Sequence, residues 1–138
     1  MRSRVFGAFV GLVAAVAAPF PSGPAAAHEP RRFEACTVQL PGTCMDRGAS
    51  FLYGDTVVVR GRVEPPHAGR VARVLRRDPG SDVWRRAGTV TVSDRGRMRF
   101  VWHTTRADAV QNAPYLFRFR IPGHGASDRT EAYVLFGE

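Results

Sequence analysis

The stretch TVVVRGRV at residues 56–63 alternates apolar and charged side chains, and this alternation decides the fold class. Successive side chains of a β-strand point to opposite faces, so three of its valines share one face while Arg60 and Arg62 share the other. The stretch therefore predicts a strand with one side buried and one side in water.

The same two-residue period returns in later segments, which are separated by turns rich in glycine and proline. Further strands are predicted at residues 71–76, 84–92, 97–102, 115–121 and 132–136. A short edge strand near residues 49–53 or 37–40 would bring the number to about seven. The mature chain shows no sustained helical period, although residues 105–111 allow one helical turn. Short strands between such turns favour an all-β antiparallel sandwich.

Two tryptophans and the aromatic residues of segment 115–119 follow this strand pattern. We expect Trp84 and Trp102 in the core, because aromatic side chains dominate the packing energy of small interiors. The alternative is a platform of exposed rings that binds carbohydrate.

Length and composition limit the function. The 138 residues allow one domain, which excludes a multidomain enzyme and a polytopic membrane protein. The net charge of +8 comes from 20 arginines and no lysine. The missing lysine indicates first the coding bias of a GC-rich genome and only second a chemical role.

Residues 1–27 have the organisation of a secretory signal peptide. Arg2 and Arg4 precede an uncharged apolar run at residues 5–18, and small residues at 25–27 predict cleavage after Ala27. A membrane anchor is the alternative, but it needs about 20 apolar residues. We therefore expect a secreted protein, extracellular or in the cell envelope, without a transmembrane span. The mature chain keeps 18 arginines against 12 acids, a net charge of +6.

Residues 28–50 show no sustained period, and we predict an irregular N-terminal extension before a sandwich at residues 51–138. Cys36 and Cys44 lie in this extension, and in an exported protein two cysteines are expected to form a disulfide. The chain-entropy model assigns so short a loop about 2–3 kcal/mol of stabilisation.

Four features extend along the predicted strands: YGDTVVVRGRV at 53–63, Trp84, GRMRF at 96–100 and YLFR at 115–118. Together they resemble the motifs of small immunoglobulin-like domains in secreted actinobacterial proteins. The resemblance implies an immunoglobulin-like sandwich and a non-catalytic module. It also implies that the Tyr115 hydroxyl binds the loop before its strand, as in a tyrosine corner.

The motifs of common enzyme classes are absent from the sequence, among them the nucleophile elbow, the phosphate-binding loop and the zinc-binding His-Glu-x-x-His. We therefore expect a non-enzymatic protein without a cofactor. The leading hypothesis is a binding module of the cell envelope or extracellular space. Another is a structural accessory subunit of an envelope assembly.

Arginines on the polar faces of the strands are the candidate binding residues, because guanidinium groups bind phosphate and carboxylate in a bidentate way. The set is Arg60, Arg62, Arg97, Arg99, Arg118 and Arg120. Because neighbouring strands lie only about 4.8 Å apart, these arginines are expected to form a dense basic surface. The partner would be an anionic cell-wall polymer, polysaccharide, lipid head group or acidic protein. Export argues against nucleic acid as the physiological target. The alternative is a solvated face without a ligand.

Histidines suggest a different hypothesis. Cleavage after Ala27 would place His28 at the mature N-terminus, where its amine and ring can chelate copper together. In a sandwich the loops that carry His67 and His124 belong to the same end, and His103 belongs to the other. A copper site of His28, His67 and His124 is thus predicted, and three solvated histidines are the alternative.

Overall fold

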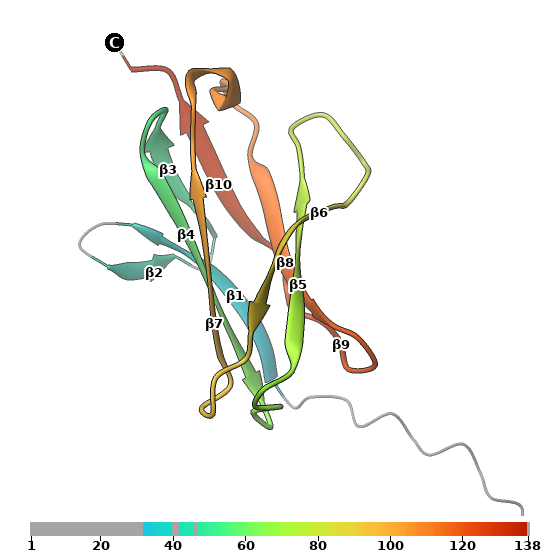
Figure 1. Ribbon diagram of the computed structural model, residues 1–138. Coiled ribbons are helices and arrows are strands. Elements are labelled where there is room, and N and C mark those ends of the chain that lie inside the picture. Colours follow the sequence, from blue (N-terminus) through green and yellow to red (C-terminus); the bar gives the residue numbers. More distant parts are fainter. Residues whose placement is uncertain (1–31, 40–41, 46, 138) are drawn as a thin grey trace, which may run out of the picture.

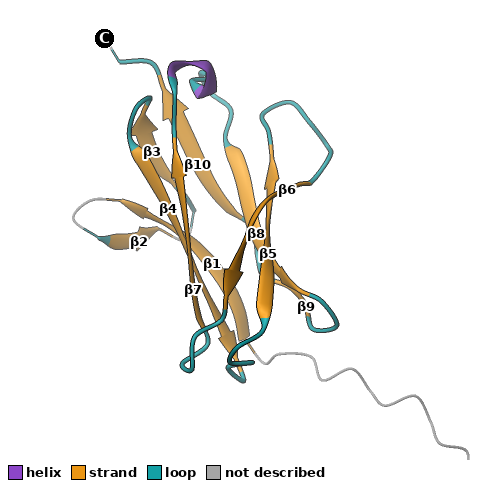
Figure 2. Ribbon diagram, viewed as in Figure 1, coloured by secondary structure: helices purple, strands orange, loops and turns teal. Residues whose placement is uncertain are grey.

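The computed structural model describes residues 32–39, 42–45 and 47–137. The predicted signal peptide and His28 lie outside the described residues, which contain strands and one short 3-10 helix (Figures 1 and 2). The strands are β1 (Arg32–Gln39), β2 (Thr43–Met45), β3 (Ala49–Leu52), β4 (Thr56–Glu64), β5 (Val71–Arg77), β6 (Arg85–Thr91), β7 (Arg97–His103), β8 (Tyr115–Ile121), β9 (Gly125–Ala126) and β10 (Thr130–Leu135), and the helix η1 is Arg106–Asp108.

Two sheets pack face to face (Figure 1). Sheet A has the strand order β2-β1-β4-β7, and sheet B has the order β3-β10-β8-β5-β6, with β9 paired to β8. All neighbours are antiparallel except β3 and β10, which run parallel. The prediction of an all-β sandwich is confirmed.

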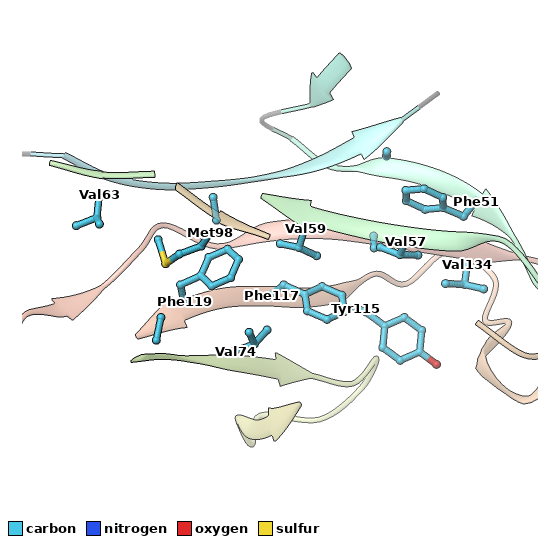
Figure 3. Close-up of a cluster of buried hydrophobic side chains, with 14 of the residues drawn as sticks. Phe51, Val57, Val59, Val63, Val74, Met98, Tyr115, Phe117, Phe119 and Val134 are labelled. Carbon is cyan, nitrogen blue, oxygen red and sulfur yellow. The ribbon is translucent and has the colours of Figure 1, made fainter. Parts of the chain in front are cut away.

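The core lies between β4 and β7 of sheet A and β5, β8 and β10 of sheet B (Figure 3). Val57, Val59 and Val63 of β4 point inward, as the alternation predicted, and meet the fully buried Phe117 and Phe119. Gly61 allows the sheets to approach, since a Cβ there would lie 2.6 Å from a ring carbon of Phe119. β4 therefore has a glycine at this inward position, because the ring of Phe119 fills the space that a side chain would occupy.

The prediction of an irregular extension at residues 28–50 is wrong within the described residues. β1 pairs with β4 over the seven positions from Arg32 to Val38, and β2 and the start of β3 follow. The period was weak because the inward positions of β1 include Ala35 and Thr37, which are small or polar. The described residues consequently contain ten strands where about seven were expected.

Thr37 fastens β1 to the opposite sheet. Its hydroxyl donates to the carbonyl oxygen of Glu131 at 2.7 Å, so the hydroxyl of Thr130, 2.8 Å away, must donate to Thr37. Both threonines are fully buried. A buried hydroxyl needs a hydrogen-bond partner. Thr37 lies in β1 of sheet A and Thr130 in β10 of sheet B, so these hydrogen bonds join the two facing sheets.

Tyr115 makes the contact that the resemblance implied. Its hydroxyl donates to the carbonyl oxygen of Asp108 at 2.8 Å, and this hydrogen bond ties the end of η1 to the start of β8. Burial is the main cause that raises the pKa of Tyr115, and Asp108 raises it further while Arg76 opposes the rise. The phenol is therefore held in its neutral, donating form. Among the described residues no helix is long and apolar enough to span a membrane.

Candidate functional site: the basic groove of sheet A

The outer face of sheet A carries two opposed pairs of arginines. The register of β4 and β7 places Arg60 opposite Arg99, and Arg62 opposite Arg97. All four side chains are exposed. Like charges placed directly opposite each other destabilise an antiparallel sheet, so this arrangement costs stability. An anion between the paired guanidinium groups would remove that cost.

These arginines line a groove with a volume of about 720 Å³. Glu34 and the Cys36–Cys44 disulfide, contributed by β1 and β2, form its other side. The predicted disulfide is thereby confirmed, and Cys36 lies beside Arg60 in the register of β1 and β4. An uncharged sulfur bridge next to Arg60 leaves the positive charge of that residue uncompensated.

The two arginine pairs differ in their acidic neighbours. Nη2 of Arg62 lies 2.7 Å from a carboxylate oxygen of Glu64, and Glu34 is bound in the same way by Arg32. In the described part of the chain Arg60, Arg97 and Arg99 have no ion pair. The Arg60–Arg99 pair is thus the stronger anion site, and the Arg62–Arg97 pair is partly neutralised.

A row of valines ends the charged region. Val38, Val58 and Val101 lie side by side across β1, β4 and β7, one outward position beyond the Arg60–Arg99 pair. Beyond Arg62, the next outward position on β4 is Glu64. The basic groove is therefore two arginine pairs long, with an apolar boundary at one end and an acidic one at the other.

The prediction that all six candidate arginines form a dense basic surface together is wrong for Arg118 and Arg120. Both belong to β8 of sheet B, so they lie on the opposite outer face of the sandwich from the four groove arginines. The alternation along a strand predicts which residues point outward. The sheet to which the strand belongs then decides on which outer face of the sandwich they lie.

On sheet B the arginines pack against Trp84. The guanidinium carbon of Arg118 lies 4.2 Å from the centroid of the Trp84 ring, and that of Arg77 lies 5.7 Å away. Trp84 is half-buried on the outer face just before β6, so its predicted core position is wrong. Trp102 does pack against the core, as predicted.

Arg76 contacts two aromatic rings, which the sequence did not reveal. Its guanidinium carbon lies 5.0 Å from the centroid of the Trp102 ring and 5.5 Å from that of Tyr115, while its Nε donates to Asp78 at 2.8 Å. It covers the aromatic end of the core. The signal was present as a break in the pattern, because Arg76 occupies an inward position of β5, opposite Phe117.

The histidines meet partly as predicted. The rings of His67 and His124 have centroids 4.1 Å apart at one end of the sandwich, and His103 lies at the other end, opposite Thr56. Nη2 of Arg70 donates to Nε2 of His124 at 3.1 Å. The described residues hold no group of three or more histidine, cysteine or acidic side chains that could bind a metal.

No family model matches the chain, and no curated protein matches it.

Proposed function

We propose that the protein is an exported, non-enzymatic binding module that holds an anionic partner in the basic groove of sheet A. One observation carries the proposal: Arg60 opposes Arg99 and Arg62 opposes Arg97 along a groove of about 720 Å³. Four exposed guanidinium groups in two facing pairs offer forked donors to phosphate or carboxylate oxygens.

Two further observations support a place outside the cell. The N-terminal sequence has the organisation of a secretory signal, and the Cys36–Cys44 disulfide is of a kind that persists in oxidising compartments. Anionic polymers of the envelope are the partners such a location would supply.

The test compares two double variants with the same loss of charge. Arg60→Gln/Arg99→Gln empties the stronger pair of the groove. Arg73→Gln/Arg120→Gln removes an opposed, exposed pair from the outer face of sheet B. Affinity for polyphosphate and polyglutamate, measured by calorimetry at several salt concentrations, should fall at least about tenfold for the first variant and less than about twofold for the second.

The wild-type affinity should also fall steeply with added salt, as contacts between exposed charges do. Equal losses in the two double variants would show that only the net charge matters and would overturn the groove as the site.

A second candidate is copper binding, which the 4.1 Å approach of the His67 and His124 rings favours. His28 would be the third ligand of such a site and lies outside the described residues. Arg70 stands in the way, because its guanidinium occupies Nε2 of His124 and repels a cation.

Copper binding is tested with protein that starts at His28, by Cu(II) titration followed with electron paramagnetic resonance. His124→Ala should weaken binding, Arg70→Ala should strengthen it, and His103→Ala at the other end should change nothing. Equal Cu(II) binding by His124→Ala and wild type would exclude the site.

A further inference from the structure

We infer that the basic groove binds a linear polyol phosphate polymer whose backbone runs along β4 and β7, with one phosphate between each opposed arginine pair. The inference rests on the proposed function and names the class of anion. It follows from the spacing of the pairs, their width and the two ends of the groove.

Spacing along the strands favours a phosphodiester. Arg60 and Arg62 are two residues apart on β4, as are Arg97 and Arg99 on β7, which places the two pairs about 7 Å apart. Two extended residues contain six backbone bonds. A phosphodiester with a three-carbon bridge also has six bonds from one phosphorus to the next. An extended polymer of this kind therefore keeps the same register as the strand beside it.

The width of each pair suits a phosphodiester group. Directly opposed residues have Cβ atoms about 5 Å apart, so two guanidinium groups can approach one anion from both sides. A phosphodiester has two free oxygens, and each arginine of a pair can bind one of them. A polyuronate fits less well, since its carboxylates stand on sugar rings whose linkage repeat is shorter.

The two ends set the number of phosphates. Beyond Arg60 and Arg99 the row of Val38, Val58 and Val101 offers no donor side chain, and beyond Arg62 stands Glu64. The groove thus accommodates two consecutive phosphates. The second contributes less, because Glu64 already binds Arg62.

A polyol bridge is favoured over a nucleoside bridge. Single-stranded nucleic acid shares the six-bond repeat, but proteins that bind it stack the bases on aromatic side chains. Among the residues that the structure describes, those that line the groove include no aromatic ring. A polymer without bases loses nothing there, and a cell-envelope polymer of this chemistry also fits an exported protein.

The experiment measures affinity against the number of phosphates, using synthetic 1,3-glycerol phosphate oligomers with one to four phosphodiesters. We expect binding to tighten at least about tenfold from one phosphate to two, and to change less than about twofold from three to four. Oligogalacturonate of equal charge should bind at least about tenfold more weakly. Single-stranded oligothymidylate with the same number of phosphates should bind no tighter than the glycerol phosphate oligomer.

Variants assign the steps. Arg62→Gln/Arg97→Gln should abolish the gain from one phosphate to two while leaving the affinity for one phosphate nearly unchanged. Arg60→Lys/Arg99→Lys keeps the charge but loses the forked donors, so it should bind severalfold more weakly. Arg73→Gln/Arg120→Gln on sheet B is the matched control and should behave as wild type.

The outcomes separate the inference from the proposed function. Equal affinity for uronate, or affinity independent of phosphate number, overturns the inference if binding still requires Arg60 and Arg99. Tighter binding of oligothymidylate overturns the polyol bridge and points to nucleic acid. No binding of any polyanion, or binding that ignores Arg60 and Arg99, overturns both.

Discussion

The two outer faces of the sandwich carry arginines in the same alternating pattern, and the structure uses them differently. On sheet A, Arg60 and Arg99 stand exposed beside a groove and have no ion pair in the described part of the chain. On sheet B, Arg118 is half-buried, and its guanidinium packs on the ring of Trp84.

The difference teaches that an arginine on a strand is no sign of a site by itself. An arginine stacked on an aromatic ring stabilises the fold through the charge–ring attraction and through the burial of its stem. An arginine opposite another arginine weakens the fold unless an anion joins them. Register therefore separates an arginine stacked on a ring from an arginine opposed to another one. Arg73 and Arg120 on sheet B are opposed as well, so it is the groove beside Arg60 and Arg99 that marks their pair as the candidate site.

The largest effect is expected at the disulfide that borders the groove. Cys36→Ser/Cys44→Ser should lower the free energy of unfolding by about 2–3 kcal/mol, because the unfolded chain regains the freedom of the closed loop. Urea denaturation measures the loss. The variant would lose the covalent bond between β1 and β2 of sheet A. An unchanged midpoint would show that the disulfide contributes nothing to the stability of the fold.

Next comes Trp84 on sheet B. Trp84→Ala removes the stacking of Arg118 and Arg77 and should cost about 1–2 kcal/mol, while anion binding stays as in wild type. Thermal unfolding and polyphosphate titration measure both quantities. If polyanion binding fell together with stability, sheet B would also be a binding face and the contrast would fail.

The third prediction concerns Tyr115 at the end of the core and the dependence of stability on pH. Tyr115→Phe loses the bond to Asp108 and should cost about 1 kcal/mol at neutral pH. The folded pKa of Tyr115 is raised mainly by burial, so its contribution is complete below the unfolded pKa and disappears as pH rises through the folded one. Wild-type stability should therefore decline above about pH 10, and the variant should decline less.

Tyr133 is the control for that decline. Its pKa is raised as well, mainly by the hydrogen bond that its hydroxyl donates to Glu131 at 2.9 Å. Because Tyr133 is far less buried than Tyr115, Tyr133→Phe should leave most of the alkaline decline in place. Urea denaturation from neutral to alkaline pH distinguishes the two, and a decline that follows Tyr133 would contradict the role of Tyr115.

The smallest effect is expected in the groove. Arg99→Gln relieves the repulsion from Arg60 and should raise the free energy of unfolding by a few tenths of a kcal/mol, up to about 0.5. Thermal unfolding at low salt measures the gain, which should vanish at high salt. Arg118→Gln on sheet B should instead destabilise. A loss of stability in Arg99→Gln would mean that the groove arginines support the fold.

Alternation predicted the strands whose inward side chains are large, and β4, β7 and β8 form where it placed them. It failed for β1, because Ala35 and Thr37 gave too weak a period, and for Trp84, because a bulky ring can pack on arginines outside the core. Register and sheet order are properties of the folded chain. For that reason the opposed Arg60–Arg99 pair and the separation of Arg118 from it became visible only in three dimensions.

One short stretch of chain provides an edge of each sheet. β1 covers the open side of β4 in sheet A, and β3, ten residues further on, covers β10 in sheet B. A protein that begins at residue 53 would lack β1, β2 and β3, and β4 and β10 would each lose a neighbouring strand. The free backbone donors and acceptors of β4 and β10 would then be templates for other chains, so such a trimmed form should aggregate rather than merely unfold.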